Sequence, residues 1–251
     1  MELRQREMPL ICGHRGSCGS APENTLASFR RAVDDGADMV ELDVRLTKDA
    51  ELVVLHDRSV NRTTNGRGTL RRLTLDQIQS LDAGSWFSKK FAGEPLPTLR
   101  QVVEILPSHI SLNIEVKTDG ERRRMEEPLL HLLRTMDLVD RVLVSSFDHQ
   151  FLQRFHARDP EILIGALLSP IRDMGKKPSA IARRTGAAVF LCSIRQITKR
   201  LADDVHAHDL VLGCYGVNSR KQCGKAMKFH AGIIISDYPK RVKSYLPHSR
   251  G

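Results

Sequence analysis

The sequence is short of long hydrophobic runs, of aromatic residues and of paired cysteines. No apolar run approaches the ~18 residues that a membrane-spanning helix needs, and the charged start at residues 1–8 lacks the apolar segment of a signal peptide. The cysteines are five in number and have no CxxC spacing, which argues against a disulfide framework or a zinc site. We therefore expect no integral membrane segment, reduced thiols and a cytoplasmic location.

Aromatic residues make up only 5% of the chain, so few side chains are available to stack on nucleic-acid bases. The net charge of +9 would suit an acidic partner, but the basic residues are spread along the chain and fall mostly on predicted helices. We interpret them as solvated helix faces and expect no nucleic-acid partner. Attraction of a small anionic substrate is compatible with the same charge.

The chain has 251 residues and 41% hydrophobic content, and short β-rich runs alternate with amphipathic runs almost to its end. The predicted strands cover residues 9–14, 39–45, 52–56, 110–116, 141–146, 162–168, 187–192, 210–215 and 232–236. The predicted helices cover residues 25–35, 97–106, 121–136, 148–158, 177–185, 197–207 and 219–229. Because only residues 46–51 separate the second run from the third, we count that pair as one barrel position.

The alternation then amounts to eight β–α repeats, which predict an α/β fold of the TIM (β/α)8 barrel type. No linker or abrupt change of composition divides the chain, so we expect one domain over residues 1–251. Residues 58–96 are rich in turn-forming residues and are interpreted as a small insertion after the second strand.

Carboxylates occupy one face of the strand predicted at 39–45. Side-chain alternation places Val40, Leu42 and Val44 on one side and Glu41 and Asp43 on the other. The outer face of a barrel strand is covered by helices and must be apolar, so we expect the two carboxylates to point into the barrel. The alternative is an edge strand whose polar face meets water.

The strand predicted at 110–116 repeats this pattern, with Glu115 on its polar face and Lys117 just beyond it. Three carboxylates that converge in a barrel mouth would repel one another and lose hydration unless a cation joined them. Oxygen ligands without accompanying cysteine favour Mg²⁺ or Ca²⁺ over zinc.

Two histidines end neighbouring strands and so lie near the same mouth. His14 follows the first strand, and His56 follows the run at 52–55. A histidine at a strand end is often structural, but a pair beside a metal suits acid and base roles near neutral pH. Arg15 and Lys117 add fixed positive charge that suits a phosphate group. The residues therefore predict metal-assisted hydrolysis or transfer at a phosphorus centre.

Several short segments carry a resemblance to a known family. In chain order they are HRG at 14–16, PENT at 22–25, ELDV at 41–44, HD at 56–57, DAGSWF at 82–87, LPTL at 96–99, NIEVK at 113–117, SSFD at 145–148 and SDYP at 236–239. Together they resemble the glycerophosphodiester phosphodiesterase family over nearly the whole chain. One departure is Ala50, where the family usually has glycine, and another is Gly216 after Tyr215, where a larger residue is more usual.

The resemblance implies a TIM barrel and one divalent cation, Mg²⁺ or Ca²⁺. It also implies three groups of site residues, namely the metal ligands Glu41, Asp43 and Glu115, the acid–base pair His14 and His56, and the phosphate-binding residues Arg15 and Lys117. The implied reaction is metal-dependent hydrolysis of a glycerophosphodiester to glycerol 3-phosphate and an alcohol. Alternatives are a lysophospholipase D-like activity on the same barrel and a non-catalytic protein that binds a phosphate ligand or nucleic acid.

Overall fold

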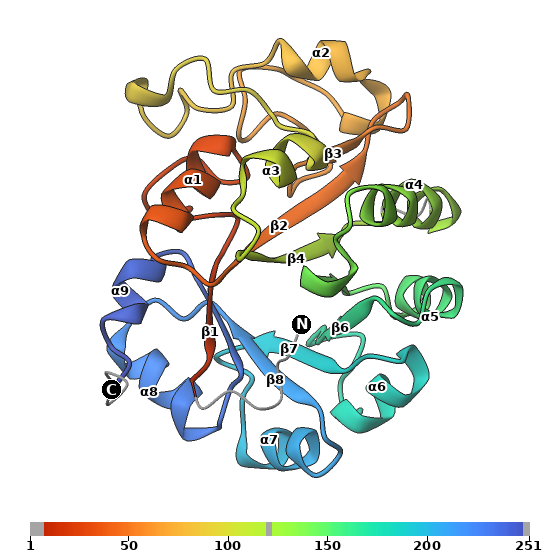
Figure 1. The fold of residues 1–251 in the computed structure, drawn as a ribbon, viewed down its shortest axis with the longest axis vertical. Coiled ribbons are helices and arrows are strands. Elements are labelled where there is room, and N and C mark those ends of the chain that lie inside the picture. Colours follow the sequence, from red (N-terminus) through yellow and green to blue (C-terminus); the bar gives the residue numbers. More distant parts are fainter. Residues whose placement is uncertain (1–7, 119–121, 248–251) are drawn as a thin grey trace.

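Eight parallel strands form a sheet that closes on itself (Figure 1). The computed structural model describes residues 8–118 and 122–247. Within them the barrel strands are β1 (Leu10–Gly13), β2 (Met39–Leu46), β4 (Ser111–Val116), β5 (Val142–Ser146), β6 (Leu163–Leu167), β7 (Val189–Ser193), β8 (Val211–Tyr215) and β9 (Ile233–Ser236). Strand β1 pairs in parallel with both β9 and β2, which closes the ring. The predicted TIM barrel is therefore confirmed.

Helices surround the strands (Figure 1). They are α1 (Leu26–Asp34), α3 (Leu99–Ile105), α4 (Arg122–Thr135), α5 (His149–Arg158), α6 (Pro178–Thr185), α7 (Lys199–His206), α8 (Arg220–Lys228) and α9 (Pro239–Lys243). Several begin at a side-chain cap; the hydroxyl of Thr25, for example, accepts a hydrogen bond from the backbone N–H of Ser28. The sequence prediction missed α9, because five residues are too few to show helical periodicity.

The strand faces divide as the alternation predicts. On β2, Val40, Leu42 and Val44 belong to the apolar layer between strands and helices. The side chains of Met39 and Glu41 lie on the inner face, Met39 in an apolar cluster and Glu41 in a pocket. The barrel interior is thus apolar at the amino-terminal ends of the strands and polar at their carboxyl ends, where TIM barrels carry their active sites.

The run at 52–54 is strand β3 (Leu52–Val54), which pairs antiparallel with the end of β2. The turn between them holds Ala50 at φ 66°, a left-handed conformation that favours glycine. Residues 55–98 follow and include the insertion predicted at 58–96, with η1 (Leu70–Arg72), α2 (Leu75–Gln79) and η2 (Lys89–Phe91). A small apolar cluster joins the insertion to β3 and consists of Val53, Leu55, Val60, Leu70, Ile78, Ala83 and Leu96.

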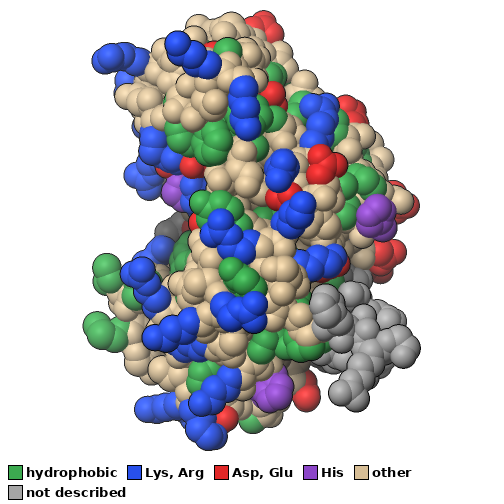
Figure 2. Space-filling view, turned by 90° about the vertical axis from the view of Figure 1, so that its left-hand side faces the viewer, with side chains coloured by type: hydrophobic (Ala, Val, Ile, Leu, Met, Phe, Trp, Pro, Cys, Tyr) green, Lys and Arg blue, Asp and Glu red, His purple; other side chains and the backbone are tan. Residues whose placement is uncertain are grey.

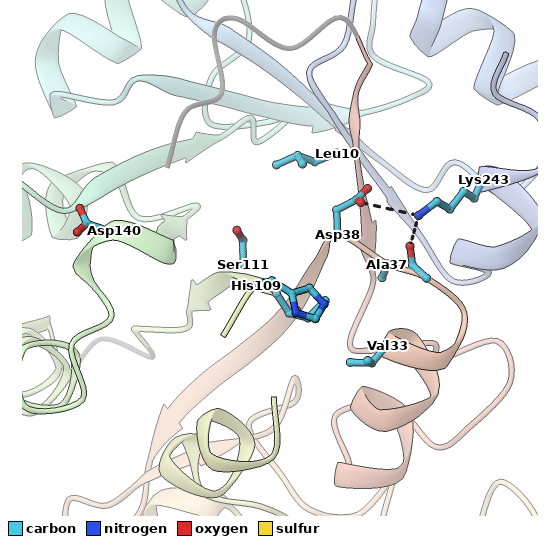
Figure 3. Close-up of a pocket in the computed structure, with 10 residues that line it drawn as sticks. Leu10, Val33, Ala37, Asp38, His109, Ser111, Asp140 and Lys243 are labelled. Atoms are coloured by element: carbon cyan, nitrogen blue, oxygen red, sulfur yellow. Dashed lines mark hydrogen bonds and ion pairs between the residues drawn. The ribbon is translucent and has the colours of Figure 1, made fainter. Parts of the chain in front are cut away.

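A cavity of about 440 Å³ lies at the amino-terminal ends of the strands (Figure 3). Lys243 of α9 closes one side, where its Nζ donates to the Gly36 carbonyl at 2.6 Å and lies 3.8 Å from a carboxylate oxygen of Asp38. Asp38 in turn accepts a hydrogen bond from the backbone N–H of Ile11 in β1. These contacts tie the last helix to the first strand, which is a structural role.

None of the helices in the described parts of the chain combines the length and the apolar character needed to cross a membrane.

Candidate active site

The loop after β1 is folded tightly so that two consecutive side chains enter the barrel mouth. Arg15 has φ 48° and Gly16 has φ 82°. A Cβ atom at Gly16 would lie 2.4 Å from the hydroxyl oxygen of Ser28, so only glycine fits against α1. The backbone N–H of Arg15 donates to Glu41 at 2.8 Å, which fixes the loop to β2.

Three carboxylates converge inside the mouth. Glu41 and Asp43 come from β2, and Glu115 from β4 lies directly beside Asp43 in the strand register. One oxygen atom from each lies within 4.8 Å of the others. Glu41 and Asp43 are almost fully buried, with 3% and 1% of their surface exposed. Oxygen atoms at this spacing match the ligand set that a hard divalent cation prefers.

Burial makes these charges interact strongly. Burial, reinforced by the neighbouring Asp43 carboxylate, raises the pKa of Glu41 to about 7. Burial alone would also raise the pKa of Asp43, but the cations of Lys117 and Arg15 outweigh it and hold that pKa well below its usual value. The charge of Asp43 is therefore largely compensated by cationic side chains, and that of Glu41 is compensated less.

The two predicted phosphate-binding cations are engaged with these carboxylates. Lys117 Nζ lies 2.9 Å from an oxygen of Asp43 and also bonds Glu115. Arg15 Nε lies 3.2 Å from the other oxygen of Asp43, and its terminal nitrogen lies 2.6 Å from Glu23. Both cations also line the pocket, so they border the space that a substrate would fill.

His14 is held by a carboxylate from the far end of the chain. Its Nδ1 lies 2.7 Å from Asp237, directly after β9. The pKa of Asp237 is lowered to about 2, because its bond to His14 outweighs the effect of burial. Asp237 is therefore ionised and accepts, so Nδ1 carries the proton and Nε2, 4.0 Å from Glu41, is free to exchange one. Asn218 steadies Asp237 by donating to its second oxygen at 2.6 Å.

His56 is held in the same way by its neighbour in sequence. Its Nδ1 lies 2.7 Å from Asp57, which Arg62 Nε also bonds at 2.7 Å. The hydrogen bond from Arg62 is the main reason that the pKa of Asp57 is strongly lowered. The terminal nitrogens of Arg62 then reach Glu23 at 2.8 Å, so this guanidinium joins the loop after β3 to the loop after β1.

The two imidazoles differ in how far neighbouring groups offset the effect of burial on their pKa values. Burial lowers the pKa of His56 below 6.5, in spite of the attraction of Asp43. For His14, burial alone would also lower the pKa, but the hydrogen bond to Asp237 and the charge of Glu41 reverse the direction and raise it. The pocket therefore contains two imidazoles of unlike basicity, each oriented by a carboxylate and each able to exchange protons.

The pocket has a volume of about 190 Å³, below the size range of sites for drug-sized ligands. Six of the seven predicted site residues line it, and the seventh, Asp43, lies beneath it among them. Its opposite wall is apolar and consists of Phe147, Leu167, Tyr215 and Ile235. A small substrate with one strongly anionic side and one less polar side fits these surroundings.

Sequence reasoning missed the side chains that orient the histidines. Asp237, Asn218, Arg62 and Asn24 were not predicted as site residues, and Asn24 donates to Asp43 at 2.8 Å. Asn24 adopts φ 59°, which turns its amide toward β2. Asp237 lies in the SDYP segment, so the motif marked the position without indicating its partner.

Comparisons with known proteins agree with this geometry. Residues 14–241 match the Glycerophosphoryl diester phosphodiesterase family. The chain is 34% identical to a glycerophosphodiester phosphodiesterase of Bacillus altitudinis, with 94% of this chain and 97% of that protein covered.

Two solved structures are similar over almost their full length. A phosphodiesterase of Oleispira antarctica, solved in complex with the product sn-glycerol-3-phosphate, has a TM-score of 0.88 and 29% identity, with 95% of this chain and 96% of that one covered. A glycerophosphodiester phosphodiesterase of Agrobacterium tumefaciens has a TM-score of 0.84 and 28% identity, with 94% and 100% covered. The chain therefore belongs to the glycerophosphoryl diester phosphodiesterase family, and it is an enzyme of the glycerophosphodiester phosphodiesterase class.

Proposed function

We propose that the enzyme hydrolyses glycerophosphodiesters to glycerol 3-phosphate and an alcohol, with a divalent cation and two histidines as an acid–base pair. The observation that carries this proposal is the convergence of three carboxylates, two of them buried, with two carboxylate-held imidazoles in one small pocket. The similar enzyme from Oleispira antarctica was solved with sn-glycerol-3-phosphate as product, which supports the same product here.

The cation in this proposal is a single Mg²⁺ or Ca²⁺ ion held by Glu41, Asp43 and Glu115. The fit rests on the donor set, because all three ligands offer hard oxygen atoms within 4.8 Å of one another. The raised pKa of Glu41 supports it as well, since this buried carboxylate lacks enough compensating charge from the protein. When bound, such a cation stabilises negative charge on phosphate oxygens and lowers the pKa of a coordinated hydroxyl.

The histidines move the protons in this proposal. His14 Nε2 accepts the proton of the attacking hydroxyl while Asp237 stabilises the imidazolium that results. His56, oriented by Asp57, gives a proton to the departing alcohol oxygen as its bond to phosphorus breaks. If the attacking hydroxyl belongs to the substrate, the first step forms a cyclic phosphate ester. Water then hydrolyses this ester in a second step, in which the two histidines exchange roles.

Arg15 and Lys117 complete the proposal as contacts of the substrate phosphate. Both line the pocket, and both are bonded to carboxylates that the cation would use. A cation held by Asp43 and Glu115 would neutralise these carboxylates, and the positive charges of Arg15 and Lys117 would then be available to phosphate oxygens. Arginine offers a two-pronged donor and lysine a point charge.

The test is turnover of glycerophosphocholine with and without a chelator. We expect chelation to abolish release of glycerol 3-phosphate and Mg²⁺ or Ca²⁺ to restore it, whereas Glu41→Ala, Asp43→Ala and Glu115→Ala variants stay folded and inactive. Full turnover after exhaustive chelation would overturn the role of the cation.

A lysophospholipase D-like activity is the second candidate, because the apolar wall of Phe147, Leu167, Tyr215 and Ile235 faces the carboxylates. The pocket of about 190 Å³ is too small to enclose an acyl chain, which favours the deacylated substrate. Parallel assays on lysophosphatidylcholine and glycerophosphocholine decide between the two.

We further propose that residues 1–251 act as one catalytic domain with an insertion at about 58–96, and that the enzyme works in the cytoplasm without a nucleic-acid partner. The free state of all five cysteines, four of them buried, supports a reducing location.

A further inference from the structure

The loop between β6 and α6 exposes apolar side chains and buries a charged one, the reverse of the usual pattern. Ile171 and Met174 are 82% and 80% exposed, whereas Asp173 between them is 4% exposed. Among the residues that the structure describes, Trp86, at 42%, is the one other exposed large hydrophobic side chain. A single exposed apolar residue is ordinary, but two on a loop that buries its carboxylate indicate a contact surface.

The buried carboxylate fixes this arrangement. One oxygen of Asp173 accepts a hydrogen bond from the backbone N–H of Ser169 at 3.0 Å, and the other accepts one from Lys176 Nζ at 3.0 Å. Because the loop folds around Asp173, the side chains of Ile171 and Met174 are directed outward. Their exposure is therefore a property of a hydrogen-bonded loop.

The exposed pair lies on the catalytic side of the barrel. The loop follows Leu167, the last residue of β6, and Leu167 itself lines the catalytic pocket. The loop therefore leaves the same strand ends that carry the carboxylates and histidines. Figure 2 shows hydrophobic side chains projecting from the left-hand margin of the molecule, with Lys and Arg side chains around them.

Positive charge surrounds the apolar tips. Arg172, Lys176 and Lys177 are exposed, and Asp173 is the only acidic residue in residues 170–177, so three positive charges and one negative leave a net charge of +2. A nucleic acid would use the cations and leave the aliphatic tips in water, and a protein partner would not require the excess of cations. A bilayer with anionic headgroups uses both, because apolar tips enter the headgroup layer while lysine and arginine meet the phosphates.

We propose that the loop from Ile171 to Lys177 docks the enzyme on the surface of an anionic lipid bilayer, with the catalytic mouth facing that surface. The attachment is interfacial and reversible, since it rests on two apolar side chains and on the cations Arg172 and Lys177, whereas Lys176 is paired with Asp173. It goes beyond the hydrolytic reaction proposed above and does not depend on which bond is cleaved.

Co-sedimentation with vesicles tests this proposal on the full chain. We expect the wild-type enzyme to sediment with vesicles of phosphatidylcholine mixed with phosphatidylglycerol, and much less with phosphatidylcholine alone. An Ile171→Ser/Met174→Ser variant should bind the mixed vesicles at least about 10-fold more weakly. Lys177→Glu should weaken binding about 30-fold, from about fivefold for each unit of charge near the surface.

The matched control is Arg184→Glu, which makes the same change of charge in the last turn of α6, at the opposite end of that helix. It should weaken binding by about twofold or less, because charges more than a Debye length from the surface are screened. A second readout is the fluorescence of Met174→Trp in a Trp86→Phe background, which should shift to the blue with mixed vesicles.

Three results would overturn docking through this loop. The first is that the wild-type enzyme stays in the supernatant with mixed vesicles. The second is that the Ile171→Ser/Met174→Ser variant binds as tightly as the wild type. The last is that Arg184→Glu binds as weakly as Lys177→Glu. The first would leave a protein partner as the occupant of the loop, and the last would indicate attraction by overall charge. Turnover of free glycerophosphocholine should be the same in all these variants, so failure of docking is distinguishable from failure of the proposed reaction.

Discussion

The carboxylate of Asp237 lies 2.7 Å from Nδ1 of His14, although 223 positions separate the two residues. The contact exists because β9 pairs with β1 and closes the barrel, which brings the loops after these two strands side by side. The orientation of the His14 imidazole therefore depends on closure of the whole ring.

Replacing Asp237 with asparagine tests whether Asp237 controls the titration of His14. The hydrogen bond to Asp237 is the largest influence that raises the pKa of His14, so Asp237→Asn should lower that pKa. In a bell-shaped profile of kcat/KM against pH, only the limb that belongs to His14 should move to lower pH. We expect the alkaline limb to move, because the pKa of His14 is raised and that of His56 is lowered, so His14 has the higher pKa of the two.

Movement of the acidic limb would instead assign the lower of the two pKa values to His14. Asp57→Asn is the matched control, because the hydrogen bond from His56 to Asp57 raises the pKa of His56. This variant should move the opposite limb to lower pH. If neither limb moved in Asp237→Asn, Asp237 would not control the titration of His14.

Removing the charge of Glu41 should stabilise the enzyme when divalent cations are absent. The pKa of Glu41 is raised to about 7 in the folded protein against 4.5 for an exposed glutamate, so the folded state holds the proton more tightly. The stability that this proton provides is complete below pH 4.5 and is lost as the pH rises through about 7. Glu41→Gln should therefore raise the free energy of unfolding by up to about 3 kcal/mol above neutral pH.

Denaturant unfolding in the presence of a chelator measures this difference, which should shrink as the pH falls toward 4.5. Addition of Mg²⁺ or Ca²⁺ should stabilise the wild type more than the variant, because the variant has lost one ligand. Equal unfolding midpoints without cation at every pH would contradict the raised pKa.

His56→Ala should lower turnover of glycerophosphocholine by about 10²–10⁴-fold, the range for loss of a positioned proton donor or acceptor. If His56 protonates the leaving alcohol, a substrate with a nitrophenol leaving group should be affected far less, because nitrophenolate departs without a proton. Steady-state rates on the two substrates make the comparison. Equal defects on both would remove His56 from the leaving-group side.

The attacking hydroxyl should belong to the substrate itself. A glycerophosphodiester has a free hydroxyl next to its phosphate ester, and internal attack forms a five-membered cyclic phosphate, favoured by effective molarities of about 10⁵–10⁸ M in well-oriented systems. An analogue without this hydroxyl should bind but hardly react, and phosphorus NMR of single turnovers should show a transient cyclic ester. Near-normal hydrolysis of the analogue would establish direct attack by water.

Ala50→Gly should stabilise the turn between β2 and β3. Ala50 adopts φ 66°, where a Cβ atom costs about 1–2 kcal/mol, partly offset by the greater freedom of glycine in the unfolded chain. We expect the free energy of unfolding, measured by thermal unfolding, to rise by about 0.5–1 kcal/mol, with unchanged turnover. The opposite substitution, Gly186→Ala, should destabilise the protein. Gly186 has φ 76°, and a Cβ atom added there would lie 2.2 Å from the His156 ring.

The parts of the site that follow a local period could be predicted from the sequence. Alternation on one strand places Glu41 inside the barrel, and strand ends place His14 and His56 at its mouth. The partners Asp237 and Arg62 could not be predicted, because each reaches its contact through an irregular loop whose path depends on tertiary packing. The sequence also did not indicate that Lys117 and Arg15 would bond the carboxylates, since this depends on distances across strands.

Arg62 bonds Glu23 in the loop after β1 and Asp57 in the loop after β3, and these loops carry His14 and His56. The spacing of the two imidazoles is therefore set partly by the ion pairs of Arg62, a residue outside the barrel strands. Because Arg62 belongs to the insertion, an exchange of insertions between relatives would alter the alignment of the histidines even where every barrel strand was kept. The insertion therefore helps to position the two histidines, although it contains neither of them.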